Sequence, residues 1–299
     1  MLSILIPTYN YDCYPLVSGL QRQASALKIN FEVIVADDAS REEMKGENRK
    51  INEIPGCRYV ELERNIGRAC IRNYLAESAR FDNLLFIDSD AGIKEDDFLE
   101  KYLKEAGSKK VVCGGLLHAH SMPSADVSLR YTYEKMADKY RVASIREQCP
   151  YDKFTTFSFL IPRTLFLDIK FDCNFVKYGH EDTLFGYELR KRNVPIVHID
   201  NPLYHLGLES NDTFLKKTET SIRNLYIEKD KLMEHSRLYI LYSRICRKGL
   251  RIPLLLFYKS AHRLLKMNLL GRHPDMRVFA LYKLGYLCAF ENRYKDGGI

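Results

Sequence analysis

The sequence predicts an α/β protein with a mainly parallel central sheet flanked by helices, followed by a helical C-terminal extension. Short apolar runs typical of buried strands alternate with helical segments over about the first 120 residues. From residue 235 onward the chain is leucine-rich and carries 13 Lys and Arg against three Asp and Glu. The chain has 299 residues, 46% of them hydrophobic and 28% charged, which excludes collagen-like and wholly disordered classes.

The first half of the chain supplies most of the expected sheet. Residues 2–7 form an apolar run stopped by proline, and the stripe of Leu16, Leu20 and Ala24 predicts a helix over 14–27. The further expected strands are 31–36, 58–62, 83–87 and 111–113, and the further expected helices are 68–78 and 96–105. In such sheets a ligand binds beyond the carboxyl ends of the strands.

The second half is less regular, with strands expected at 157–161 and 196–199 and helices at 183–191 and 213–241. From residue 239 the chain is expected to be helical, with a break at Pro253. The longest apolar run, residues 252–258, is shorter than the roughly 20 residues of a membrane span. The first residues lack a signal-peptide pattern, which favours a cytoplasmic location. No C-x-x-C pair occurs among the eight cysteines, which are expected to be reduced.

The basic extension predicts an anionic partner, either a membrane surface or nucleic acid, of which nucleic acid is the less favoured. Lys259, Arg263 and Lys266 fall on one helical face, with apolar residues such as Leu265 and Leu269 around it. This pattern suits a helix lying in the headgroup plane of an anionic membrane. The alternative is that these leucines pack as a helical subdomain and the charges form a solvated face.

Acidic residues follow two of the expected strands. Asp88 and Asp90 come directly after the strand at 84–87, where two carboxylates could hold a divalent cation together with a diphosphate. Asp37 and Asp38 follow the strand at 31–36 and could accept hydrogen bonds from a base or ribose. The alternatives are an acidic turn for the first pair and an Asx turn capping a helix for the second.

Two helix starts also carry candidate residues. Gly67 leads into a helix with Arg72, where a helix N-terminus suits a phosphate. Glu181 and Asp182 begin the helix at 183–191, where carboxylates complement the helix dipole. One of these two acids could equally be a general base that takes a proton from an acceptor hydroxyl.

Taken together, these segments resemble family 2 glycosyltransferases of the GT-A fold. Five motifs come in the family's order, at residues 3–10, 33–40, 65–73, 86–90 and 179–183. The resemblance covers roughly residues 1–215 and departs from the family at Ala39, where the family usually has Gly. It implies a catalytic domain over 1–215, with a donor-nucleotide half at 1–100 and an acceptor half at 101–215. Residues 216–299 would form the basic helical extension.

The resemblance also implies roles for single residues in binding the donor nucleotide. Asp38, or less readily Asp37, would bind uracil or ribose, and Arg72 would reach the base or the diphosphate. The full implied donor-binding set is Pro7, Thr8, Tyr9, Asp37, Asp38, Arg72, Asp88 and Ser89.

The implied chemistry is metal-assisted and inverting. Asp90, with Asp88 and with His205 nearby, would ligate Mn²⁺ or Mg²⁺ bridging the diphosphate of the donor. Asp182 would be the catalytic base and Glu181 would contact the acceptor. The implied reaction moves a sugar from a nucleoside diphosphate sugar, with UDP favoured, to a glycan or lipid-linked acceptor in surface polysaccharide or glycoconjugate synthesis. Such an enzyme would be cytoplasmic and peripheral on the inner face of the membrane.

Two other functions compete with this interpretation. Haloacid-dehalogenase-like phosphatases also place Asp-x-Asp after a strand, but they usually carry Thr at the position that Gly92 occupies here. A non-catalytic nucleotide-sugar binding module is the second alternative, and the presence of Asp182 disfavours it.

Overall fold

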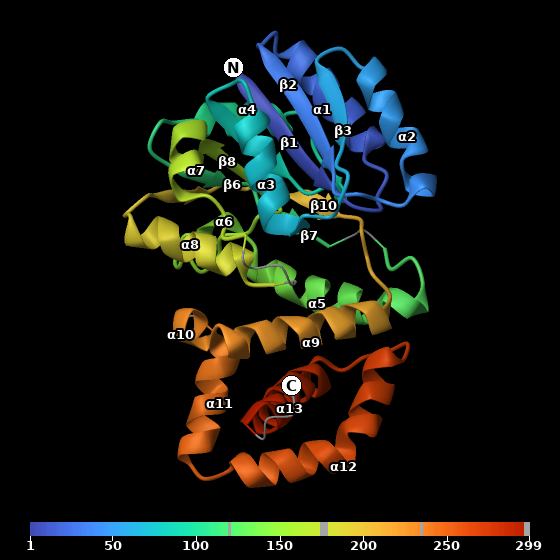
Figure 1. Cartoon of the computed structure of the whole chain (residues 1–299), viewed down its shortest axis with the longest axis vertical. Coiled ribbons are helices and arrows are strands. Elements are labelled where there is room, and N and C mark those ends of the chain that lie inside the picture. Colours follow the sequence, from blue (N-terminus) through green and yellow to red (C-terminus); the bar gives the residue numbers. More distant parts are fainter. Residues whose placement is uncertain (119–120, 174–178, 234–235, 296–299) are drawn as a thin grey trace. The chain divides into compact units, whose positions relative to one another are not determined.

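The computed structural model describes residues 1–118, 121–173, 179–233 and 236–295 (Figure 1). The chain divides into two compact units. The first contains residues 1–118, 138–173 and 181–207, and the second contains residues 121–137, 179–180, 208–233 and 236–295. All the strands lie in the first unit, whereas the second unit is helical.

A seven-stranded sheet in the order β3-β2-β1-β4-β8-β6-β9 forms the centre of the first unit. Its strands are β1 (Leu2–Thr8), β2 (Phe31–Asp37), β3 (Cys57–Glu61), β4 (Asn83–Ile87), β6 (Val111–Cys113), β8 (Ser158–Pro162) and β9 (Ile196–His198). Only β8 runs antiparallel to its neighbours β4 and β6. The prediction of a mainly parallel sheet is therefore confirmed.

Helices cover both faces of this sheet because its central strands are buried on both sides. Along β1 the side chains of Ile4 and Ile6 enter one core with α1 (Tyr14–Ala26) and α4 (Phe98–Glu105). Leu5 points to the other face, where α3 (Gly67–Ser78), α7 (Arg163–Ile169) and α8 (Glu181–Lys191) pack. The first unit also contains two single-turn helices, α2 (Gly46–Arg49) and α6 (Ala143–Arg146).

A second, three-stranded sheet joins distant parts of the first unit. It consists of β5 (Ala91–Gly92), β10 (Leu203–His205) and β7 (Leu116–Leu117), with β10 in the middle. β10 pairs antiparallel with β5, so that His205 lies opposite Ala91. This pairing carries residue 205 to the end of the Asp88–Asp90 turn.

The second unit is built from helices around one apolar core. These are α5 (Ser128–Ala137), α9 (Asn211–Ile227), α10 (Lys229–Leu232), α11 (Arg237–Arg247), α12 (Arg251–Leu270) and α13 (Met276–Lys295). The predicted break at Pro253 is wrong, because this proline lies in the first turn of α12, where its missing N–H breaks no helical hydrogen bond. Among the described residues, no helix combines the length and the apolar character needed to cross a membrane.

The expectation that all cysteines are reduced is also wrong for one pair. Cys70 on α3 and Cys173 are joined as a disulfide, with their Cα atoms 5.2 Å apart. The neighbouring Asn73 exchanges hydrogen bonds with the backbone of Phe171, which brings the two segments together. The separation of 103 residues in the sequence hides this proximity.

Candidate active site

The site lies where the parallel strands β1, β2 and β4 end. Thr8 at the end of β1 pairs in register with Asp37 at the end of β2, and its carbonyl accepts a hydrogen bond of 2.9 Å from the Asp38 N–H. Tyr9 follows with 55% of its surface exposed, and Pro7 is partly buried. The predicted base-binding segment 7–9 therefore lies next to the Asp37–Asp38 pair.

Asp37 and Asp38 both have structural partners inside the protein. Asp37 accepts hydrogen bonds from the Ser40 N–H at 2.6 Å and the Tyr59 hydroxyl at 2.5 Å, and its side chain is buried. Asp38 accepts from the backbone N–H groups of Ile66 and Gly67, at 2.7 and 3.0 Å, at the start of α3. The helix-capping alternative thus describes the Asp38 contacts, although the cap lies on α3 rather than on the next helix in the chain. Burial raises the pKa of the Asp38 carboxyl, and these two N–H donors oppose the rise.

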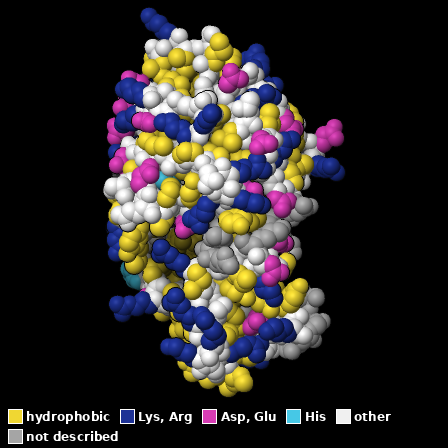
Figure 2. Space-filling model, turned by 90° about the vertical axis from the view of Figure 1, so that its left-hand side faces the viewer, with side chains coloured by type: hydrophobic (Ala, Val, Ile, Leu, Met, Phe, Trp, Pro, Cys, Tyr) yellow, Lys and Arg dark blue, Asp and Glu magenta, His cyan; other side chains and the backbone are white. Residues whose placement is uncertain are grey.

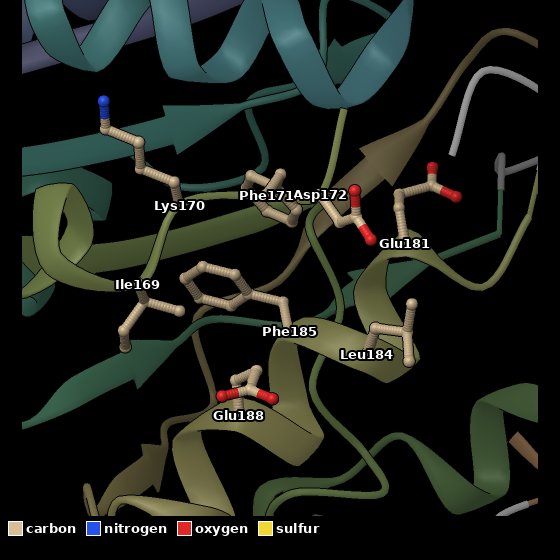
Figure 3. A pocket seen from close by; sticks show the side chains of 8 residues that line it. All are labelled: Ile169, Lys170, Phe171, Asp172, Glu181, Leu184, Phe185 and Glu188. Carbon is tan, nitrogen blue, oxygen red and sulfur yellow. The ribbon is translucent and has the colours of Figure 1, made fainter. Parts of the chain in front are cut away.

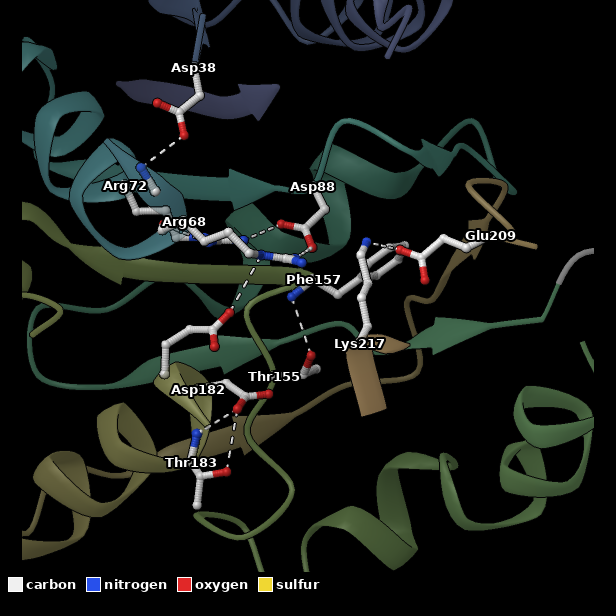
Figure 4. Close-up of polar contacts among 12 residues, drawn as sticks. Asp38, Arg68, Arg72, Asp88, Thr155, Phe157, Asp182, Thr183, Glu209 and Lys217 are labelled. Carbon is white, nitrogen blue, oxygen red and sulfur yellow. Dashed lines mark hydrogen bonds and ion pairs between the residues drawn. The ribbon is translucent and has the colours of Figure 1, made fainter. Parts of the chain in front are cut away.

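Asp88 is held by two arginines from α3 (Figure 4). The buried Arg72 guanidinium pairs with one carboxylate oxygen of Asp88, and Arg68 reaches the other at 3.3 Å. Arg68 also lies 3.5 Å from a carboxylate oxygen of Glu181. Arg68 therefore links the end of β4 to the start of α8, two segments that are far apart in the sequence.

Asp90 lies beside His205. The Asp90 Oδ2 and His205 Nε2 atoms are 3.0 Å apart, and the Asp90 carbonyl accepts a hydrogen bond of 2.8 Å from the Leu206 N–H. A Cβ on Gly207 would lie 2.4 Å from Asp90 Oδ2, so only glycine leaves the carboxylate this position. Ser89, between the two acids, is partly exposed.

Of the three predicted metal ligands, Asp90 and His205 lie together, whereas Asp88 is paired with arginines. Asp90 and His205 offer one oxygen and one nitrogen ligand at a separation that two ligands of one ion can adopt, and Mn²⁺ accepts both types. Asp88 is engaged by the two arginines instead. Within the described part of the chain, no group of three or more His, Cys, Asp or Glu side chains is placed to hold a metal. The pair therefore fits an ion that takes its remaining ligands from phosphate oxygens or water.

Asp182 lies in the first turn of α8 next to Glu181. Burial, and then the negative charge of Glu181, raise the pKa of the Asp182 carboxyl from 3.8 to about 6. One of its oxygens accepts a hydrogen bond of 2.7 Å from the Thr183 N–H, which fixes the carboxylate at the helix start. A carboxylate with this pKa can accept a proton near neutral pH.

Glu181 also lines a cavity of about 240 Å³ (Figure 3). The stacked rings of Phe171 and Phe185, whose centroids are 4.4 Å apart, form its apolar wall. Three carboxylates line it, those of Asp172, Glu181 and Glu188. Lys170 also lines the cavity and pairs with Glu77 at 2.8 Å. The cavity thus combines aromatic surface with hydrogen-bond acceptors, and its acidic side chains outnumber its one basic side chain.

The structure brings most of the predicted site residues to one edge of the sheet. Asp88 and Glu181 share Arg68, and Asp182 follows Glu181 on the same helix. The predicted site residues do not include Arg68, although it makes this link. The available signal was its position one turn before Arg72, because residues four apart lie on the same helix face.

Comparison with known proteins agrees with the fold. The EpsH protein of Bacillus subtilis strain 168, whose name places it among the glycosyltransferases, is 23% identical over 266 residues, which cover 82% of this chain and 76% of EpsH. The solved mannosyltransferase PcManGT from Pyrobaculum calidifontis, in complex with GDP-Man and Mn²⁺, matches 98% of this chain and 86% of its own, with a TM-score of 0.58 at 15% identity. S. aureus TarS 1-349 with UDP-GlcNAc matches 99% and 92%, with a TM-score of 0.51 at 18% identity.

The similarity to these solved structures concerns the fold, which is of the GT-A type. The sequence itself matches the family described as Glycosyl transferase family 2 over residues 3–169, more than half of the chain. The chain therefore belongs to glycosyl transferase family 2 and is a transferase.

Proposed function

We propose that this enzyme transfers a sugar from a nucleoside diphosphate sugar, with UDP as the favoured nucleotide, to a hydroxyl of a glycan or lipid-linked acceptor, with inversion at the anomeric carbon. One observation carries the proposal. The carboxylates and arginines at the end of β4 lie next to Glu181 and to a carboxylate, Asp182, whose pKa is about 6. Membership of the family decides against a phosphatase and against a non-catalytic module.

The donor nucleotide is assigned to the ends of β1, β2 and β4. PcManGT and TarS are described with GDP-Man and UDP-GlcNAc, which supports a nucleotide sugar as donor here. The diphosphate would lie near Arg68 and Arg72, whose guanidinium groups can pair with phosphate oxygens. The remaining proposed donor contacts are Pro7, Thr8, Tyr9, Asp37, Asp38, Asp88 and Ser89.

Asp90 and His205 would hold the Mn²⁺ or Mg²⁺ ion, with Asp88 close by. A bound divalent ion offsets the negative charge that develops on a diphosphate leaving group. The Mn²⁺ in the PcManGT complex supports this assignment. Gly207 leaves room for the Asp90 carboxylate beside His205, because it has no Cβ.

Asp182 would act as the base that takes the proton of the acceptor hydroxyl as it attacks the anomeric carbon. The raised pKa supports this role, because a base works best when its pKa is close to the ambient pH. A single displacement inverts the anomeric centre and needs no covalent sugar–enzyme intermediate. One positioned carboxylate is therefore sufficient.

The acceptor would occupy the cavity beside Glu181. Its aromatic wall suits the apolar face of a sugar ring, and its three carboxylates can accept hydrogen bonds from hydroxyl groups. The same carboxylates would repel a negatively charged sugar. We therefore expect a neutral or amino sugar at this position.

These assignments correspond to a donor half at residues 1–100, an acceptor half at 101–215 and a basic extension at 216–299. An enzyme of surface polysaccharide or glycoconjugate synthesis with a lipid-linked acceptor would work as a peripheral protein on the inner face of the membrane.

The direct test of the proposal is a thermal-shift screen of UDP- and GDP-sugars with and without Mn²⁺. A ligand that binds only the folded protein raises the melting temperature, by an amount that grows with its concentration relative to Kd. We expect a metal-dependent rise for at least one nucleotide sugar. The absence of a rise across the panel, with and without metal, would contradict the proposal.

A further inference from the structure

Helix α12 carries large apolar side chains on the side that faces away from the core of its unit. Leu255, Tyr258, Leu265 and Leu269 are buried in that core. Ile252, Leu256, Leu264 and Met267 fall on the opposite side at helical spacing, and each leaves 61–70% of its surface exposed. The exposed Ser260 and Arg263 lie between Leu256 and Leu264 on the same side. Exposed apolar side chains grouped on one side of a helix and bordered by polar residues mark an interaction surface.

The packing of α12 on α13 fixes which side faces outward. A Cβ on Gly285 of α13 would lie 2.3 Å from the ring of Tyr258, so this glycine admits the ring and brings the two helices close together. The sequence alone suggested Leu265 and Leu269 as membrane-facing residues, and the structure buries both. The outward side instead carries Leu256 and Leu264, together with Ile252 and Met267. We call these four exposed residues the outer face of α12.

The charge around the outer face is positive. Lys259 and Arg263 lie beside it on α12, and α12 contains no acidic residue. Arg247 and Lys248, at the end of α11, are exposed just before α12 begins. Figure 2, which shows one side of the molecule, has dark blue and yellow side chains intermixed over its lower part, with a few magenta acidic ones among them. An apolar row beside Lys and Arg is the pattern of a helix that lies in the headgroup plane of an anionic bilayer.

We propose that the outer face of α12 inserts into the surface of an anionic lipid bilayer, with Lys259 and Arg263 at the level of the phosphate groups. A second copy of the chain is the less favoured occupant, since two such faces would bring like charges together. The proposal extends the peripheral location given above by naming the surface responsible. Its test measures lipid binding and not sugar transfer, so it fails or succeeds independently of the catalytic assignment.

The chain contains no Trp, so one introduced Trp reports its own surroundings. We would place it at Leu264 (Leu264→Trp) and, as a matched control, at the exposed Ile227 of α9 (Ile227→Trp). Each variant is mixed with vesicles of phosphatidylcholine alone or with phosphatidylglycerol added. In vesicles that contain phosphatidylglycerol, we expect the Trp fluorescence of Leu264→Trp to shift to shorter wavelength and to be quenched by brominated lipid. We expect neither change for Ile227→Trp, nor for Leu264→Trp with phosphatidylcholine alone. An unshifted Leu264→Trp, or an equal shift in the control, would overturn the proposal.

Two paired substitutions separate the apolar contribution from the charge. Leu256→Gln with Leu264→Gln should weaken vesicle binding about 100-fold, roughly tenfold for each leucine removed from the bilayer. Lys259→Gln with Arg263→Gln should weaken it roughly 25-fold, about fivefold for each charge, and should reduce its salt dependence. Far-UV circular dichroism confirms folding, and Lys101→Gln with Lys104→Gln on α4 controls for lost charge. The proposal would be overturned if both paired variants bound vesicles as tightly as the wild type. It would also be overturned if the wild type were a dimer and the paired leucine variant a monomer that still bound vesicles.

Discussion

Asp182→Asn should make the protein more stable while it removes the catalytic base. The burial of Asp182 and the charge of Glu181 raise the pKa of the Asp182 carboxyl from 3.8 to about 6, so the folded state pays to keep this group ionised. The difference between these two pKa values corresponds to about 3 kcal/mol. Because the side chain is only partly buried, we reduce this figure to about 1–2 kcal/mol at pH 7.

The sign of this effect depends on pH in a defined way. A carboxyl whose folded pKa is raised binds its proton more tightly in the folded state, so the protein loses stability as the pH rises from about 4 to about 6 and carries the full penalty above that. As the pH falls from 6 towards 4, the wild-type carboxyl takes up a proton and the penalty disappears. The gain in free energy of unfolding in Asp182→Asn should therefore be largest at pH 7 and small near pH 4. Asparagine still offers an oxygen to the Thr183 N–H, so the helix start is retained.

Urea denaturation at pH 7 and near pH 4 measures the stability, and turnover with the identified donor and acceptor measures the chemistry. We expect turnover to fall by roughly 10²–10⁴, the usual contribution of a positioned base. In the wild type, kcat/KM should fall as the pH drops below about 6. Asp168→Asn, which changes an exposed carboxylate on α7 outside the proposed site, is the control. A variant that is no more stable at pH 7, or that keeps near wild-type turnover, would refute this reasoning.

Three further substitutions test other parts of the site. Gly207→Ala should displace Asp90, because the new Cβ would lie 2.4 Å from Asp90 Oδ2. Metal-dependent nucleotide binding, measured by titration calorimetry, should then weaken at least tenfold, and an unchanged affinity would contradict this. Arg68→Gln should raise the KM for the donor about tenfold, because it removes the link between Asp88 and Glu181, and a KM like that of an Arg58→Gln control would argue against that role. Ala39→Gly should raise the free energy of unfolding by about 1 kcal/mol in urea, because Ala39 has a φ of 59°, a conformation that glycine adopts without strain; a lowered stability would count against this explanation.

The sequence was sufficient to predict the sheet and much of its active edge, because both depend on short local patterns. The strands that carry Thr8, Asp37 and Asp88 are apolar runs that end at a polar residue, and parallel strands bring such ends together. These strand ends belong to motifs that occur in the same order as in family 2 glycosyltransferases, and this order predicted the family. Both the expected fold class and the expected family are confirmed.

The missing information concerns contacts between distant segments. Arg68 looks like an exposed helix residue until tertiary packing places Asp88 and Glu181 on either side of it. The bond between Cys70 and Cys173 likewise depends on how α3 meets the segment after α7. The spacing of Arg68 and Arg72 shows only that they share a helix face, and no local pattern identifies Asp88, Glu181 or Cys173 as the partners.

In the C-terminal extension, the sequence pattern also does not predict which side chains are buried. Helix α12 is apolar around much of its circumference, so periodicity does not decide which leucines face inward. Packing against α13 makes that choice, and it buries Leu265 while it exposes Leu264. The roles of the single site residues and the division at residue 215 stay predictions.

The central claim is that the end of β4 and its neighbours bind a nucleoside diphosphate through a metal held by Asp90 and His205. Titration calorimetry of UDP and GDP into the wild type and Asp90→Asn, each with and without Mn²⁺, tests it most directly. We expect at least one nucleotide to bind only with Mn²⁺ and to lose this binding in Asp90→Asn, while the melting temperature of the variant protein stays close to that of the wild type. Equal affinity with and without Mn²⁺, or in the wild type and Asp90→Asn, would show that Asp90 holds no such metal.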